Sequence, residues 1–431
     1  MNPITVLFVS FFVMIALRVP VAYSLALASL LIIVQEGLRA DLVVQQMFQG
    51  LNSFTLLAVP FFLLAGQLLN SGLITDRLMR LAEVMVGWIR GGLAHINVVV
   101  SMIFAGMSGS STADTAGVGS VIIPAMYKRG FDRRFTVAIT AASSTMGSII
   151  PPSIMMVVYG AQGGVSIGGL FLAGAVPGLM IGFAMMIYSY FYAISRDLPA
   201  EARPTVREFA VAWKEGFLPL LVPVIIIGGV LTGKFTATES GMVATVYVLF
   251  LMLVFYRSAR LRELPKILSD AAVLYSQPLL AVAAASVFGW LLAYFQAPQM
   301  IIGIAGDMTG SIPLTLLSIM VVFIIVGTFM DAIPAIIIFM PIVTKLLETS
   351  GANAIHGGII VVMTLALGLI TPPYGLCLLL ASAIGKVPVV RVLPHIMAFY
   401  AIIIGIIVTI IFLPELALFL PRLVMPQFVG S

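Results

Sequence analysis

Long apolar stretches separated by short polar segments run through the whole chain. The first of them, residues 4–34, carries Arg18 and Pro20 at its middle. A charge at the bilayer centre costs at least about 2.5 kcal/mol, and proline interrupts the hydrogen bonds of a helix. The pattern therefore predicts two short helices over roughly 4–17 and 20–35, with Arg18 at a surface turn.

The same alternation of apolar and polar segments recurs in the second half of the chain, 218 to 221 residues later. There, the apolar runs 217–231 and 239–256 flank a polar turn at 236–238. The other predicted elements are a span at about 51–70, a segment with a polar centre at 91–126, a broken span at 138–159 and a span at 168–192, followed by 271–296, 311–345, 357–381 and 394–418. We interpret 1–195 and 217–431 as inverted repeats, joined by a polar cytoplasmic linker at 196–216.

Helix-breaking residues lie at corresponding positions of the two halves. Gly106 is followed 45 residues later by Pro151-Pro152, and Gly327 is followed 45 residues later by Pro372-Pro373. Irregular backbone at membrane depth is tolerated only where protein buries it or where it lines a water-filled cavity. Broken helices at matching places of two repeats point to the binding site of a transporter, so we expect two re-entrant hairpins and two broken helices.

Each predicted repeat divides into a part that stays fixed and a part that holds the interruptions. The scaffold helices are expected at 1–90 and 217–296. The hairpin and broken helix that follow are expected at 91–195 and 311–381, and 394–418 is the last span.

The composition agrees with lipid as the solvent of this chain. It is 61% hydrophobic and only 9% charged, and its mean hydropathy is +1.16. Soluble domains are about one quarter charged. At about 20 residues a span, the apolar tracts predict an all-α polytopic membrane protein with roughly ten to twelve membrane elements. The single cysteine excludes an internal disulfide, and neither a nucleic-acid-binding pattern nor a nucleophile–base pair is visible, so no enzyme activity is expected.

The distribution of basic residues predicts an orientation. With the loop 127–136 in the cytoplasm, 18 of the 22 lysines and arginines lie on the inner side, as the positive-inside rule requires. Both termini then face the periplasm of a bacterial inner membrane. Residues 75–90 alternate charged and apolar positions at helical spacing, which favours an amphipathic helix in the membrane surface, although an ordinary solvated loop also fits.

The first candidate site combines hydroxyl groups, a carboxylate and freed backbone carbonyls. Its members are Ser108, Gly109, Ser110, Ser111 and Asp114 in the hairpin, and Gly147, Ser148, Pro151, Pro152 and Ser153 in the broken helix. Hard cations prefer oxygen ligands, and an intramembrane carboxylate is a functional candidate by default. The small residues Gly106, Gly109 and Ala113 are also typical of close helix packing, and a lone Pro-Pro pair is typical of a simple kink.

The second candidate site repeats this chemistry. Its members are Gly327, Thr328, Met330 and Asp331 in the hairpin, and Gly368, Thr371, Pro372, Pro373 and Gly375 in the broken helix. Two prolines remove two backbone donors, so nearby carbonyls can coordinate a cation and the next half-helix can face an anion with its N-terminus. We expect two pockets for sodium and substrate around a pseudo-two-fold axis, with Asp114 and Asp331 as the principal metal ligands.

The ordered motifs resemble those of one known family. These are Gly106-x-Ser108-Gly109-Ser110-Ser111-x-Ala113-Asp114, Pro124-Ala125-Met126, Ile150-Pro151-Pro152-Ser153, Pro177-Gly178 and Thr371-Pro372-Pro373-x-Gly375. They look like the large membrane subunit of the tripartite ATP-independent periplasmic (TRAP) transporters, over essentially the whole chain. The resemblance implies an elevator-type ion-transporter fold and sodium-coupled uptake of a small carboxylate such as a sialic acid or a C4-dicarboxylate.

The resemblance also implies partners and roles. The partners would be a small four-helix membrane subunit, not fused here because Met1 leads directly into the large-subunit pattern, and a periplasmic substrate-binding protein. Ser108, Ser110 and Asp114 would serve the first sodium pocket, and Asp331 with the 371–375 break the second. No cofactor is expected beyond the coupling sodium ion.

Two other functions fit the same residues. A stand-alone anion–sodium symporter would take its substrate directly from solution, without a binding protein. An anion channel would conduct without a coupling ion and without saturation. The paired interruptions favour a coupled transporter over a channel.

Overall fold

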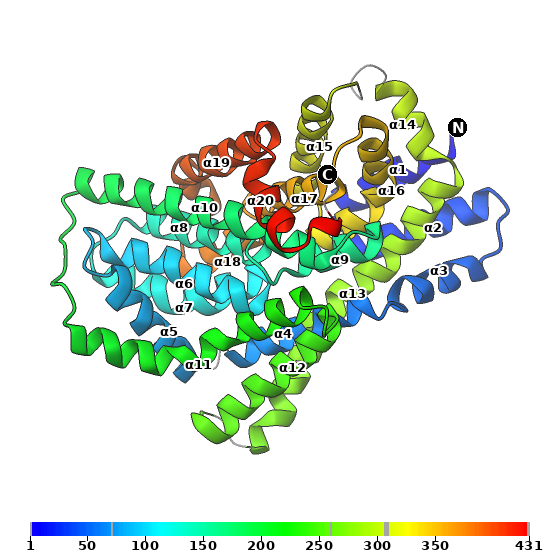
Figure 1. Cartoon of the computed structure of the whole chain (residues 1–431). Helices are drawn as coiled ribbons and strands as arrows, with labels where there is room; N and C mark the ends of the chain where they lie inside the picture. The colour runs from blue at the N-terminus through cyan, green and yellow to red at the C-terminus, as the bar shows by residue number, and fades with distance from the viewer. Residues whose placement is uncertain (1, 70–71, 259–260, 306–309, 429–431) are drawn as a thin grey trace.

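The computed structural model describes residues 2–69, 72–258, 261–305 and 310–428, and their regular structure is entirely helical (Figure 1). The helices of the first half are α1 (Pro3–Ala16), α2 (Val21–Gln35), α3 (Asp41–Leu51), α4 (Ala58–Leu69), α5 (Gly72–Val86), α6 (Gly92–Ser108), α7 (Ser111–Lys128), α8 (Arg133–Ser144), α9 (Ile154–Gly163) and α10 (Ile167–Ser195). Those of the second half are α11 (Val206–Leu231), α12 (Ala237–Phe250), α13 (Leu264–Tyr294), α14 (Ala297–Ala305), α15 (Ile312–Gly327), α16 (Ala332–Ser350), α17 (Ala354–Gly368), α18 (Leu376–Gly385), α19 (Val389–Phe412) and α20 (Glu415–Val424). The chain is therefore an all-α protein.

Six of the described helices are long and apolar enough to cross a membrane alone: α10, α11, α12 with its continuation to Phe255, α13 with the turn before it, α16 and α19. The bent pair α3 and the segment Thr55–Leu69, at 64°, raises this number to seven. Seven shorter apolar helices of 10–17 residues accompany them: α1, α2, α6, α9, α15, α17 and α18. These lengths fit a polytopic membrane protein. The ten to twelve membrane elements expected from the sequence counted hairpins and broken spans as well, and the shorter helices belong to those elements.

Polar side chains start the helices at corresponding places in the two halves. The Asp132 carboxylate accepts hydrogen bonds from the first amides of α8, and the Asn353 side chain does the same for α17. Ser110 and Asp331 are the N-caps of α7 and α16. Each pair is 221 residues apart, the spacing of the Pro-Pro pairs. An N-cap oxygen satisfies amides that a helix leaves without intrahelical partners, so these residues fix where each helix begins.

The first two predicted helices are confirmed as α1 and α2, and Arg18 is exposed at the turn between them with a φ of 65°. The predicted turn at 236–238 lies where α12 begins, after the N-cap Thr236. The predicted amphipathic segment 75–90 is helical as α5 up to Val86. Its Leu78 side chain is buried against the core.

Two boundaries differ from the sequence-based expectations, and some helices were not expected. The polar stretch 196–216 includes the first turns of α11, because a capping box between Thr205 and Glu208 starts that helix early. The expected last span 394–418 is divided into α19 and α20, with Pro414 at the division. Proline disfavours helical backbone in the residue before it, which explains why α19 ends there. The helices α3 and α14 were not predicted from the sequence.

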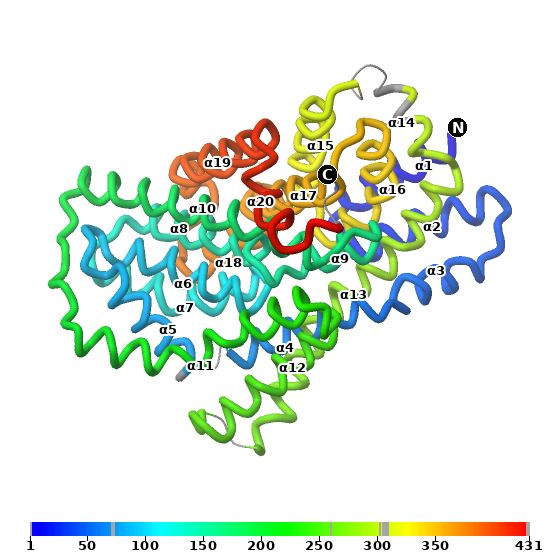
Figure 2. Tube along the Cα trace, in the orientation of Figure 1, coloured from blue at the N-terminus to red at the C-terminus, as the bar shows by residue number. Residues whose placement is uncertain are grey.

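The helix contacts pair elements across the two halves. In the outer part, α2 packs on α13 and α12 packs on α4. Around the breaks, α18 packs on α7 and α8, and α9 packs on α16. Figure 2 shows α18, near the C-terminal end of the chain, lying beside α7 and α8 of the first half. The two halves are thus interlocked around the broken segments.

Candidate functional site

The tip between α6 and α7 depends on a glycine. Gly109 has a φ of 62°, in the left-handed region that favours glycine. A Cβ at this position would lie 2.8 Å from the Pro152 carbonyl oxygen, so a side chain would also collide with the broken helix. The Gly109 carbonyl accepts a hydrogen bond from Ile154 N at 3.3 Å. The hairpin tip and the first break are therefore held together by backbone contact.

Asp114 is a fully buried carboxylate beside this tip. Its Oδ1 accepts a hydrogen bond from Ser108 Oγ at 2.6 Å. Within the described residues, its Oδ2 has no hydrogen-bond partner. A Cβ at Gly147 would lie 2.5 Å from Oδ2, so this oxygen faces the backbone of the broken helix. A buried charged oxygen without a partner is costly, which makes it a natural ligand for a cation.

Hydroxyl groups join the hairpin to the broken helix around the carboxylate. Ser111 Oγ shares a 2.7 Å hydrogen bond with Ser148 Oγ and donates to the Thr145 carbonyl at 3.2 Å. Ser153 Oγ donates to the Ser148 carbonyl at 2.5 Å and caps α9. Ser110 Oγ points instead to Thr112 Oγ1, at 3.2 Å. The structure therefore brings the two segments of the first site together, with Pro151 and Pro152 buried between the two halves of the broken helix, but it uses the Ser110 hydroxyl to cap α7 rather than to face Asp114.

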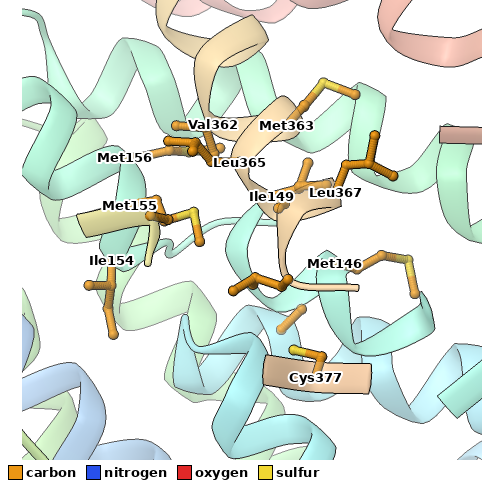
Figure 3. Packing of buried hydrophobic residues seen from close by; sticks show 14 of the residues in the cluster. Met146, Ile149, Ile154, Met155, Met156, Val362, Met363, Leu365, Leu367 and Cys377 are labelled. Carbon is orange, nitrogen blue, oxygen red and sulfur yellow. The ribbon is translucent and has the colours of Figure 1, made fainter. Parts of the chain in front are cut away.

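Apolar packing fixes the first break from behind. Figure 3 shows Met156 of α9 beside Leu365 of α17 and Ile149 of the break beside Leu367 of α17, with Met146 of the break below them. All five side chains are buried in the hydrophobic core. The break thus has one polar side, facing Asp114, and one apolar side, facing the second half of the chain.

The second break is held by glycine-to-glycine contact. A Cβ at Gly368 would lie 2.9 Å from both Cα and O of Gly327, so the ends of α15 and α17 touch through their backbones. The Thr328 carbonyl accepts a hydrogen bond from Tyr374 N at 3.1 Å. Gly375 N donates to the Thr371 carbonyl at 3.0 Å. Like Pro151-Pro152, the Pro372-Pro373 bond is cis.

The side chains of the second site are arranged differently from those of the first. Asp331 is half-buried, and its Oδ1 accepts a hydrogen bond from Ala332 N at 2.7 Å. The hydroxyls of Thr328 and Thr371 donate to carbonyls of their own helices, Ile325 O and Leu367 O. Met330 is buried beside a small cavity of about 50 Å³ lined by phenylalanines. The second site therefore offers one carboxylate and several carbonyls, with fewer free hydroxyls.

A polar network between α6 and α8 was missed in the sequence. Asn97 Nδ2 donates to Thr140 Oγ1 at 2.7 Å, and Ser143 Oγ donates to Asn97 Oδ1 at 3.2 Å. Ser101 Oγ and Ser143 Oγ are 2.9 Å apart. All four residues are buried. The signal was available, since threonines and serines recur every three to four residues on one face of α8.

Comparisons with known proteins give the family. The family model described as "Tripartite ATP-independent periplasmic transporter, DctM component" matches residues 8–416. The chain is 36% identical over 405 residues to the sialic acid TRAP transporter large permease protein SiaM of Vibrio cholerae, covering 94% of this chain and 95% of that protein. It is 38% identical over 377 residues to the C4-dicarboxylate TRAP transporter large permease protein DctM of Pseudomonas aeruginosa, covering 88% of each.

A solved structure supports the fold alone. The crystal structure of the Alcanivorax borkumensis YdaH transporter aligns with a TM-score of 0.59 at 13% identity, over 86% of each chain. The match to the family model covers nearly the whole chain. The two relatives are themselves transporter permeases, not enzymes. The chain therefore belongs to the tripartite ATP-independent periplasmic transporter family, as its DctM component, a multi-pass membrane permease.

Proposed function

We propose that this chain carries out sodium-coupled secondary uptake of a small organic acid across the bacterial inner membrane, by an elevator mechanism. Relatives over most of its length are named for sialic acid and for C4-dicarboxylates, and both are small carboxylates. The observation that carries the sodium part is the Oδ2 atom of Asp114, which is buried without a hydrogen-bond partner among the described residues. A cation is the simplest partner for such an oxygen.

The first sodium pocket would use Asp114 with hydroxyls and carbonyls around it. Ser108 orients the carboxylate through Oδ1, which leaves Oδ2 directed at the break. Ser111 and Ser148 place two hydroxyl oxygens between the hairpin and the broken helix. Oxygen ligands from both segments suit a hard cation, and its binding would tie the two segments together.

The second sodium pocket would use Asp331 with freed carbonyls near the 371–375 break. Asp331 uses one oxygen to cap α16, and the other can face a cation. The prolines at 372 and 373 donate no amide hydrogen bonds, so carbonyls nearby keep free lone pairs. This pocket would depend more on backbone oxygens than the first.

The helix pairing supports an inverted repeat with a fixed and a moving part. The contact of α2 with α13 corresponds to that of α12 with α4, and the contact of α7 with α18 corresponds to that of α16 with α9. In this proposal α1–α5 and α11–α13 form the scaffold. The hairpins and broken helices, α6–α9 and α15–α18, form the transport domain and slide against it with the substrate between the two breaks.

The family assignment makes two partners part of the proposal. A small membrane subunit would associate with this chain, and a periplasmic binding protein would deliver the carboxylate. With the basic loops in the cytoplasm, both termini would face the periplasm. Bound sodium would offset the charge of Asp114 and Asp331, so sodium and substrate would raise each other's affinity reciprocally.

The test is uptake of radiolabelled carboxylates by the purified three-part transporter in proteoliposomes. We expect uptake to require an inward sodium gradient and to fall in Asp114→Asn and Asp331→Asn. Uptake that is indifferent to sodium would refute the coupling. Uptake that persists without the binding protein would instead favour a stand-alone symporter.

A further inference from the structure

A cleft with both polar and apolar lining opens at the ends of α9 and α16 that lie away from the breaks. Its volume is about 540 Å³, within the range of small-molecule binding sites. Side chains from α3, α9, α13 and α16 line it. The cleft therefore lies between helices of the proposed scaffold and helices of the proposed transport domain.

Small residues allow these helices to meet closely enough to form the walls. A Cβ at Gly50 of α3 would lie 2.0 Å from Ser286 Oγ of α13. A Cβ at Gly289 of α13 would lie 3.3 Å from the Ile337 carbonyl oxygen of α16. Both α3 and α16 therefore approach α13 at a glycine that lines the cleft.

Three primary amides dominate the polar lining. Gln46 and Gln49 come from α3, and Gln162 comes from α9. Within the part of the chain that the structure describes, none of the three side-chain amides has a hydrogen bond to protein. Each amide offers two donors and one acceptor, which suits the hydroxyls of a polyol. Trp290 of α13 adds an aromatic surface, against which the C–H groups of a sugar can pack.

The charges of the lining favour a single carboxylate. Lys345 and Glu348, both on α16, have Nζ and Oε2 3.3 Å apart, and their side chains are 50% and 60% exposed. Such an exposed ion pair contributes little stability, so Lys345 can exchange its partner for a ligand carboxylate. A dicarboxylate would set its second charge against Glu348 or against neutral amides. An acid with one carboxylate and several hydroxyls avoids that repulsion.

We propose that this cleft is a second binding site, away from the breaks, for a hydroxylated monocarboxylate such as a sugar acid. We call it the outer site. Lys345 holds the carboxylate, the glutamine amides bind the hydroxyls, and Trp290 packs on the carbon skeleton. The inference rests on the proposed function, since it takes the cleft to lie on the path of a transported carboxylate. Gln162 and Ser153 are nine residues apart along α9, about 14 Å on a helix axis, so the site is separate from the breaks yet close to them.

The experiment measures equilibrium binding to the two membrane subunits in lipid nanodiscs, without the binding protein. The ligands are radiolabelled gluconate, sialic acid and succinate. We expect saturable binding of gluconate or sialic acid, and weaker binding of succinate. The double variant Gln46→Ala/Gln162→Ala is expected to weaken binding about 10-fold, because two hydrogen bonds to the ligand are lost. Gln45→Ala is the matched control, since Gln45 is exposed on α3 and does not line the cleft.

The charge assignment is tested with Lys345→Met/Glu348→Gln, which keeps the lining neutral. We expect this variant to lose affinity for the hydroxylated acids. Unchanged affinity in both double variants, tighter binding of succinate, or no saturable binding of either hydroxylated acid would overturn the proposal. Sodium-driven uptake by the complete transporter is measured separately. Absence of sodium-driven uptake by the wild-type transporter would refute the proposed function. Normal uptake together with unaltered ligand binding in the cleft variants would refute only the outer site.

Discussion

The two breaks share a backbone plan and differ in their side chains. In both, an N-cap residue starts the second arm of the hairpin, and a cis Pro-Pro bond interrupts the following helix. The carboxylates are not at equivalent positions, because the counterpart of Asp331 at a spacing of 221 is Ser110, and that of Asp114 is Ala335. The first break is enclosed by hydroxyls around a buried aspartate, whereas the second is built on glycine contact and carbonyls.

This difference indicates that the two proposed sodium pockets depend on different ligands. The first would be a side-chain site, whose affinity is set by one carboxylate and two serines. The second would be a backbone site, in which Asp331 is partly occupied by the amide of Ala332. Substitutions in side chains should therefore affect the first break more than the second, and the following predictions test that inequality.

The largest expected effect is that of Asp114→Asn compared with Asp331→Asn. Removing a buried charge from its partner costs about 3 kcal/mol or more, so we expect Asp114→Asn to raise the sodium concentration for half-maximal uptake at least about 100-fold. Asp331→Asn should raise it less. The measurement is sodium-dependent uptake in proteoliposomes, with the amount of folded protein in each preparation as the control. A greater loss in Asp331→Asn would reverse the proposed inequality.

A smaller effect is expected at Gly147. The added methyl group of Gly147→Ala would lie 2.5 Å from Asp114 Oδ2 and would displace a cation or the carboxylate, so we expect uptake to fall about 10-fold. Gly106→Ala is the matched control, because its nearest contact, the Cβ of Pro223, is at an ordinary 3.5 Å. The initial rate of uptake checks both variants. Equal rates would show that Gly147 does not shape the pocket.

The hydroxyls should give a more modest contrast. Ser111→Ala removes the link to Ser148 and the bond to Thr145 O, and we expect sodium affinity to fall about 5-fold. Thr328→Val should change it less than about 2-fold, since that hydroxyl is satisfied by Ile325 O of its own helix. Sodium titrations of uptake compare the two variants. A stronger effect of Thr328→Val would mean that the second site also uses its hydroxyl as a ligand.

The smallest expected effect is on thermal stability. A ligand that binds only the folded state raises the melting temperature, so replacing potassium by sodium should raise it by about 1–3 °C in the wild type. We expect most of this increase to disappear in Asp114→Asn and to remain in Asp331→Asn. Thermal unfolding of the purified membrane subunits provides the measurement. If sodium raises the melting temperature of Asp114→Asn as much as that of the wild type, Asp114 is not a sodium ligand.

Much of the fold followed from residues that break or begin helices. The sequence predicted a helix interruption at each of four places, and the structure has one at each: Arg18, the polar turn at 236–238 and the two Pro-Pro pairs. Within the first site, the sequence indicated the two short polar segments, 108–114 and 147–153, that the structure brings into contact. These signals are local, so a single sequence reveals them.

The remaining features depend on contacts between distant segments. The burial of Asp114 Oδ2 against Gly147 and the contact between Gly327 and Gly368 arise only when separate helices pack together. The short helix α3 was missed because its residues are only weakly apolar, and much of their environment comes from α13. The cleft with Gln162 and Lys345 joins four helices, and no sequence pattern brings its members together.

The packing of α18 on α7 and α8 also has a consequence for biosynthesis. Ribosomes that add about 5–20 residues per second need roughly 12–50 s to reach Leu376 after completing α7 at Lys128. During that interval the nascent first hairpin lacks the neighbour that finally covers it, including the Gly385 carbonyl that accepts a hydrogen bond from Tyr127. The newly inserted α7 must therefore be covered by lipid, water or the insertion machinery until translation is nearly finished.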